Sequence, residues 1–122
     1  MSDCRATIHD RLESILESIE LIQSWCKDRT TVHDFMLSSN GVMAFNACVM
    51  RLQVIGEHVG KLLNSDEHPL DAYQHIPWYA IYGLRNIISY EYANIDEEII
   101  VSVINNDLVP LKSAIEELLK KY

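Results

Sequence analysis

Residues 78–92 hold the side chains best suited to chemistry: five aromatic residues, Arg85 and Asn86 lie within fifteen positions of an otherwise apolar run. An arginine can bind a phosphate through charge-assisted hydrogen bonds, and an amide beside it can orient the same ligand. A second explanation exists, because buried polar groups need partners. The Arg-Asn pair could instead bond the ends of neighbouring helices while the tyrosines pack between them. The residue types and their spacing leave both explanations open.

The sequence predicts neither a metal site nor a cofactor. The five histidines lie in separate segments, and none has a second histidine at the spacing of HExxH or HxxxH. Cys4, Cys26 and Cys48 are odd in number and widely spaced, without a CxxC pair. We therefore expect Cys26 and Cys48 to pack as small reduced hydrophobic residues. Glu57 beside His58 is a further candidate for acid–base chemistry.

The charge distribution limits the partners that the chain can bind. Its formal net charge is −8, and its ten Lys and Arg residues are scattered, with Lys120-Lys121 as the longest basic run. Nonspecific nucleic-acid binding needs clustered basic residues, so we expect no DNA binding, and RNA binding only at a small local site. The acidic surface suits a basic partner protein. The apolar runs are too short for a membrane span, and residues 1–5 lack the pattern of a signal peptide. We therefore expect a cytoplasmic location.

Hydrophobic periodicity predicts two long helices, at about 3–27 and 41–63. Between them, Thr31 can cap a short helix. Gly56 and Gly60 lie one turn apart on the second long helix and indicate close contact with another helix. The predicted buried stripes are Ile8, Leu12, Ile15, Ile19, Ile22 and Cys26 on the first helix, and Val42, Phe45, Val49, Leu52, Ile55, Val59 and Leu62 on the second.

A further helix is predicted to carry Arg85 and Asn86, with Pro77 in its first turn and a turn at 93–95 after it. Acidic residues at 96–98 favour the start of a last helix, which Pro110 should kink or split. No run of alternating β-branched residues indicates a sheet. The sequence thus predicts an all-α fold, an antiparallel bundle of four to five helices that forms a single domain over residues 1–122. The predicted buried positions of the last helix are Ile99, Val103, Leu108, Leu111, Ile115 and Leu118.

Five short segments carry a resemblance to a known family. They are Ile-Gly-Glu at 55–57, Ile-Pro-Trp at 76–78, Gly-Leu-Arg-Asn at 83–86, Tyr-Glu-Tyr at 90–92 and Ile-Asp at 95–96. With these segments the chain resembles the HEPN superfamily, and within it the HepT-like branch. The order and lengths of the predicted helices agree, so the resemblance covers essentially the whole chain.

The resemblance implies a helical bundle that forms a homodimer, with the motifs of both protomers facing one cleft. Many such proteins are metal-independent endoribonucleases that act as toxins and are paired with a minimal nucleotidyltransferase antitoxin. The family motif is Arg-Asn, three variable residues, His, one variable residue, Tyr. By this match Arg85 binds the scissile phosphate, Asn86 positions it, and Tyr90 and Tyr92 line the cleft, with Glu57 and Ser89 in supporting positions.

The chain departs from that motif at the histidine, where it has Tyr90. In metal-free RNA cleavage a base removes the proton of the attacking 2′-hydroxyl, and a cation stabilises the developing charge. A tyrosine with an ordinary pKa of about 10 is a poor base near neutrality. At about 100° per residue, Tyr90 also lies roughly 140° around the helix from Arg85. Both can serve one pocket only if the helix ends near Ser89 or if a second protomer contributes.

Two functions therefore remain open. The first is a HepT-like endoribonuclease whose activity is weakened or lost because of Tyr90. The alternative is a noncatalytic dimeric module that binds a nucleotidyltransferase partner. In the family the tyrosine matched by Tyr92 accepts AMP from that partner, and the other possibility for Tyr92 is a packed aromatic whose hydroxyl bonds a neighbouring helix.

Overall fold

Helices make up every regular element of the part of the chain that the structure describes. The computed structural model describes the backbone of residues 3–122 and the side chains of residues 6–91 and 93–122. The α-helices are α1 (Asp3–Trp25), α2 (Val32–Met36), α3 (Ser39–Leu63), α4 (Trp78–Glu91), α5 (Glu97–Asn106) and α6 (Leu108–Lys121), with a short 3-10 helix, η1 (Tyr92–Asn94), after α4. The all-α prediction is confirmed.

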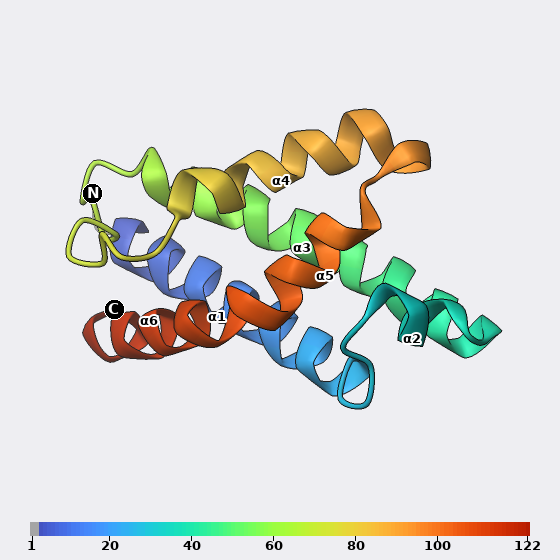
Figure 1. Ribbon diagram of the computed structural model, residues 1–122. Coiled ribbons are helices and arrows are strands. Elements are labelled where there is room, and N and C mark those ends of the chain that lie inside the picture. The colour runs from blue at the N-terminus through green and yellow to red at the C-terminus, as the bar shows by residue number, and fades with distance from the viewer. Residues whose placement is uncertain (1–2) are drawn as a thin grey trace.

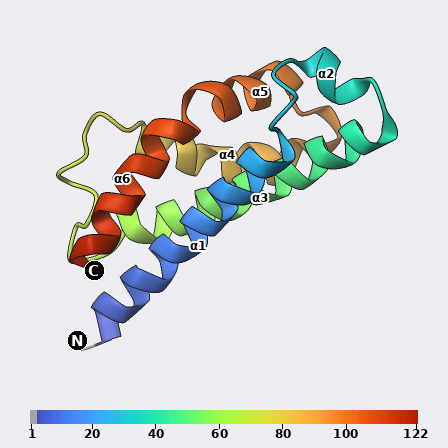
Figure 2. The ribbon, with the colours of Figure 1, turned by 90° about the horizontal axis from the view of Figure 1, so that it is seen from below.

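The long elements alternate in direction, as Figure 1 shows: α1 and α4 run one way, and α3 and the α5–α6 pair run the other way. The helix α3 lies in the middle, because it packs against both α1 and α4, while α6 packs against α1. Turned by 90°, the same arrangement places α2 at the end of the bundle opposite the two chain ends (Figure 2). The predicted antiparallel bundle is thereby confirmed, and α3 with α4 becomes the pair that positions the sequence motif.

The first helix contributes one continuous apolar stripe to the core. All six predicted positions of the α1 stripe, from Ile8 to Cys26, are buried. This stripe packs against α3 on one side and α6 on the other. No described helix is long and apolar enough to cross a membrane.

Side-chain caps fix where several helices begin. Thr31 accepts a hydrogen bond from the Asp34 backbone N–H, and the Asp34 carboxylate accepts one from the Thr31 N–H, so the predicted Thr31 cap is confirmed and forms a capping box with Asp34. Ser38 caps α3 by accepting a hydrogen bond from the Gly41 N–H, so the helix begins at Ser39, two residues before its expected start. Asp96 caps α5 by accepting from the Glu98 N–H.

The last predicted helix is split. The first part, α5, ends at Asn106, and α6 begins at Leu108 with Pro110 in its first turn, where a missing N–H breaks no intrahelical bond. The split rotates the buried face, so α5 buries Ile100, Val101 and Ile104. The predicted core position Ile99 is wrong, because it is 48% exposed on the other side of this short helix.

A second core prediction fails at the start of α3. Val42 is 38% exposed, although it continues the stripe that is buried farther along the helix. It lines a pocket of about 290 Å³ with Ala93 and Ile95 from the segment after α4. The helix periodicity placed Val42 on the correct face, but α4 ends before it can cover that end of α3.

Candidate functional site

Two glycines of α3 let α4 approach very closely. A Cβ atom at Gly56 would lie 3.0 Å from the Ile81 carbonyl oxygen and 3.2 Å from the Arg85 backbone nitrogen. A Cβ atom at Gly60 would overlap the Tyr82 ring. The predicted close contact at these glycines is confirmed, and it places Arg85 directly against α3.

Arg85 lines a pocket of about 100 Å³ between the two helices. The α3 side of the pocket supplies Glu57, Lys61 and Asn64, and α4 supplies Tyr82 beside Arg85. Arg85 is half-buried, and no hydrogen bond or ion pair joins it to a described side chain. Two cations therefore share one small pocket in an acidic chain, and no described side chain occupies the Arg85 donors that could bind a ligand such as phosphate.

Ser89, one turn beyond Arg85, is held by the neighbouring helix. The Gln53 side chain on α3 donates a hydrogen bond from Nε2 to the Ser89 hydroxyl oxygen, at 2.7 Å. This contact ties the last turns of α4 to α3. The structure thus brings Glu57 into the Arg85 pocket and gives Ser89 a contact that anchors α4.

Asn86 and Tyr90 lie on a different face of α4. Both are exposed, and Tyr90 is 85% exposed. The helix continues to Glu91, so the angle of roughly 140° between Arg85 and Tyr90 is kept, and a helix end at Ser89 is excluded. Within one chain the structure does not bring Arg85 and Tyr90 into one pocket.

Tyr92 opens η1 immediately after α4, which is the backbone position expected for a tyrosine at the end of the motif helix. Its side chain lies outside the described residues. Its predicted role as an AMP acceptor therefore stays a prediction.

The histidines lie away from the Arg85 pocket, whose lining among the described residues contains none. His58 turns toward α1, where Arg11 Nη1 donates a hydrogen bond to its Nδ1 at 3.3 Å. Burial, and then the positive charge of Arg11, lower the pKa of His58 below its usual value. His75 contacts the Tyr73 ring in the α3–α4 connection. No described imidazole therefore takes the place of the motif histidine in this pocket.

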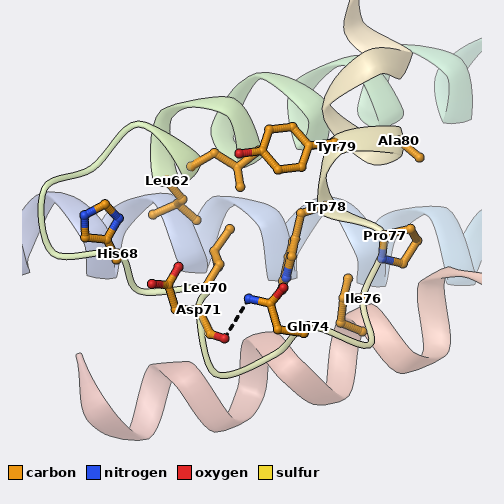
Figure 3. Close-up of a pocket in the computed structure, with 11 residues that line it drawn as sticks. Leu62, His68, Leu70, Asp71, Gln74, Ile76, Pro77, Trp78, Tyr79 and Ala80 are labelled. Atoms are coloured by element: carbon orange, nitrogen blue, oxygen red, sulfur yellow. Dashed lines mark hydrogen bonds between the residues drawn. The ribbon is translucent and has the colours of Figure 1, made fainter.

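A larger pocket of about 500 Å³ lies between the end of α3, the connection at residues 64–77 and the start of α4. Figure 3 shows His68, Asp71 and Gln74 around it, with Trp78 and Tyr79 from α4. Gln74 Nε2 donates to the Asp71 carbonyl oxygen at 2.8 Å, and the Trp78 Nε1 donates to the Tyr73 carbonyl oxygen at 2.8 Å. The Ile-Pro-Trp segment at 76–78 contributes to its lining, but no residue pattern in the connection indicated a pocket, so it was not predicted.

The described part of the chain offers no cluster of side chains that could bind a metal ion. No group of three or more His, Cys, Asp or Glu side chains there is arranged to hold a metal ion. The chemical groups around Arg85 are cations, a carboxylate, an amide and a phenol. Such groups can bind an anion and hydrogen-bond a polar ligand without a metal.

Curated relatives of the chain are named as ribonucleases. A Methanocaldococcus jannaschii protein named "Gamma-glutamylcyclotransferase and putative RNase" is 35% identical over 112 residues, which cover 89% of this chain but only 45% of that protein. A second protein of that organism, named "Putative RNase", is 28% identical, and the match covers 93% of this chain and 94% of that protein. "Probable ribonuclease HepT" of Thermococcus cleftensis is 27% identical, and the match covers 91% of this chain and 94% of that protein. No solved structure matches the chain.

The family comparison covers both helices that build the Arg85 pocket. The family model described as "Ribonuclease HepT-like" matches residues 15–118, from the middle of α1 to the last turn of α6. The chain belongs to the ribonuclease HepT-like family.

Proposed function

We propose that the protein is a metal-independent endoribonuclease of the HepT-like type that acts in the cytoplasm as the toxin of a toxin–antitoxin pair. The observation that carries the proposal is Arg85, a half-buried arginine held against α3 in a pocket, with no described partner for its guanidinium. The ribonuclease names of the relatives support the same class of activity.

Arg85 supplies the charge stabilisation that metal-free cleavage needs. The 2′-hydroxyl attacks the adjacent phosphate, and the guanidinium stabilises the negative charge that develops on the phosphate oxygens. Asn86 follows Arg85 on the outer surface of α4 and can position the same strand. Tyr90 stands where the family has its histidine, and a phenol is a poor base near neutrality. Slow cleavage follows from that replacement.

A second copy of the chain would complete the site. The outer face of α4 carries Tyr79 and Tyr90, which are 75% and 85% exposed, and Gly83, whose Cβ position has no atom within 4 Å. A glycine inside a helix costs about 1 kcal/mol relative to alanine. No contact among the described residues requires a glycine at position 83, so close approach by another helix is a reason for it. Two α4 helices crossing there would bring the motifs of both copies together.

An RNA cleavage assay tests the proposal. The purified protein is incubated with total RNA in EDTA, beside Arg85→Ala and Arg51→Ala, the latter an arginine near Glu17 outside the pocket. We expect slow, EDTA-insensitive cleavage that Arg85→Ala abolishes and Arg51→Ala leaves intact. Cleavage that survives Arg85→Ala would contradict the assignment of the site.

The replacement of the histidine gives a second test. The substitution Tyr90→His places an imidazole at this position and should raise the cleavage rate, because general base catalysis contributes about 10²–10⁴-fold. Tyr90→Phe is the matched control that removes only the hydroxyl. A wild type that already cleaves rapidly, with no gain in Tyr90→His, would show that position 90 is not the place of the base.

The exposed Tyr90 also favours a second candidate, a noncatalytic dimeric module that binds a minimal nucleotidyltransferase. In that case the partner transfers AMP to Tyr92, or occludes the cleft. Co-expression with a neighbouring nucleotidyltransferase gene, followed by intact-mass spectrometry, distinguishes these outcomes. AMP transfer to Tyr92 is supported by an AMP-sized mass increase that is lost in Tyr92→Phe and retained in Tyr90→Phe. A tight complex with an unmodified protein supports occlusion of the cleft instead.

A further inference from the structure

The Arg85 pocket contains more than a phosphate contact. Lys61, Asn64 and Tyr82 line it and belong to none of the motif positions from which the site was predicted. They come from the end of α3 and the second turn of α4. The pocket lining therefore combines cations, an aromatic ring and hydrogen-bonding groups.

The two cations are unusual for this chain. Its ten basic residues are scattered over a protein with net charge −8, yet Lys61 and Arg85 line one pocket of about 100 Å³. Glu57 lies one turn before Lys61 on α3, but no ion pair between described residues joins them. Lys61 can therefore contact a second phosphate of a strand whose first phosphate is bound by Arg85.

Tyr82 is fixed as an aromatic surface beside these cations. One edge of its ring sits in the notch left by Gly60, where a methyl group would overlap it. The residue is half-buried, so part of the ring remains open to the pocket and the solvent. Unpaired RNA bases stack on such aromatic side chains, and a ring already held in place needs little ordering when the base binds.

Glu57 and Asn64 supply the hydrogen-bonding groups. A carboxylate only accepts hydrogen bonds and can accept two in parallel. Guanine offers two adjacent donors, N1–H and the 2-amino group, on its Watson–Crick edge, so it satisfies a carboxylate bidentately. Asn64, the C-cap of α3, can both donate to and accept from the same base.

We propose that this pocket is a base-recognition subsite for guanosine in single-stranded RNA, next to the phosphate bound by Arg85. Tyr82 stacks on the base, Glu57 accepts from its Watson–Crick edge, and Lys61 contacts the adjoining phosphate. The inference rests on the proposed function for its RNA ligand, and it adds the sequence preference of the site. Lys61, Tyr82 and Glu57 are specificity and positioning residues.

Binding without cleavage tests the subsite separately from the nuclease activity. Short 2′-O-methyl RNAs, which lack the attacking hydroxyl, are labelled with a fluorophore, and their dissociation constants are measured by anisotropy. The RNAs differ at one position, which is guanosine, inosine, adenosine or uridine. We expect guanosine to bind most tightly, with a loss for inosine because it lacks the 2-amino group.

Three substitutions separate the contacts. Tyr82→Leu should weaken binding about tenfold or more, whereas Tyr82→Phe should bind as wild type because the ring remains. Glu57→Gln should remove the preference for guanosine over inosine. Lys61→Gln should lower the slope of log Kd against log salt by about 0.7, and Lys112→Gln, on α6, should leave it unchanged.

Each outcome has a definite meaning. Thermal unfolding of every variant first shows that it is folded. Equal affinity for all four RNAs, or wild-type binding by Tyr82→Leu and Glu57→Gln, overturns the subsite and leaves the nuclease proposal standing if Arg85→Ala still abolishes cleavage. Guanosine-selective binding by a protein that never cleaves RNA supports the subsite and counts against the nuclease.

Discussion

Two cysteines far apart in sequence meet in the core. The Sγ atoms of Cys26, just after α1, and Cys48, on α3, lie 3.0 Å apart, and both thiols are buried. The hydrogen bond from Cys48 lowers the pKa of Cys26, and the same bond together with burial raises the pKa of Cys48. They pack as small reduced hydrophobic residues, as expected, but their contact is a tertiary feature that the sequence did not indicate.

We expect diamide to oxidise this pair to an intrachain disulfide. Each thiol loses its hydrogen, and the diazene is reduced to the hydrazine. Closing a loop of 22 residues should stabilise the fold by about 3 kcal/mol, and calorimetry of the Cys4→Ser background should show a higher Tm after oxidation. Cys26→Ser in the same background is the control. A protein that keeps both free thiols after diamide would contradict the prediction.

His58 should make stability depend on pH. Burial and Arg11 lower its folded-state pKa, while Glu57 acts in the opposite sense with a smaller effect. The unfolded chain therefore binds a proton more readily, so the free energy of unfolding should fall as pH drops through about 6.5. Urea titrations between pH 5 and pH 8 should show a shallower fall in His58→Gln than in wild type. Identical pH profiles of unfolding free energy in wild type and His58→Gln would contradict this role of His58.

At the scale of elements, the close contact of α3 and α4 is what sets the site. A substitution at Gly60 tests this contact, because a methyl group there would overlap the Tyr82 ring. We expect Gly60→Ala to destabilise the protein by about 1–3 kcal/mol, since the ring has to move out of its notch. Urea unfolding measures the change.

The same substitution in a Tyr82→Leu background supplies its control. If the ring causes the overlap, the two substitutions should be coupled, and Gly60→Ala should cost less in the double variant. Equal costs in both backgrounds would mean that the backbone of α4, and not the Tyr82 ring, limits the space at Gly60.

At the scale of the whole molecule, one part of the exposed apolar surface lies beside the motif. Ile87 and Ile99, 41% and 48% exposed, line an apolar pocket of about 340 Å³ between α4 and α5, with Ala80 and Val103. This pocket adjoins the α4 face that carries Gly83. Burying such a patch would favour binding of a second copy of the chain at this face.

Sedimentation equilibrium at micromolar concentration should therefore give twice the chain mass of 14.0 kDa. Ile87→Glu should shift the protein toward monomer, and Val109→Glu, an equally drastic change at a residue 62% exposed on α6, should not. Added salt should strengthen the dimer, because each copy carries a net charge of −8. A monomer under all these conditions would contradict the dimer.

The sequence by itself determined the helices, their caps, most of the core and the family. Periodicity fixes the angle of a side chain on its own helix, which is why the α1 stripe was predictable. The Thr31 cap was predictable because it depends only on residues three positions apart in the sequence. Periodicity does not say which helix lies opposite or how far it reaches, and Val42 stays exposed for that reason. Only the packing of α4 on α3 decided that Lys61 and Tyr82 join Arg85 in one pocket, because such contacts depend on the distance and rotation between two helices.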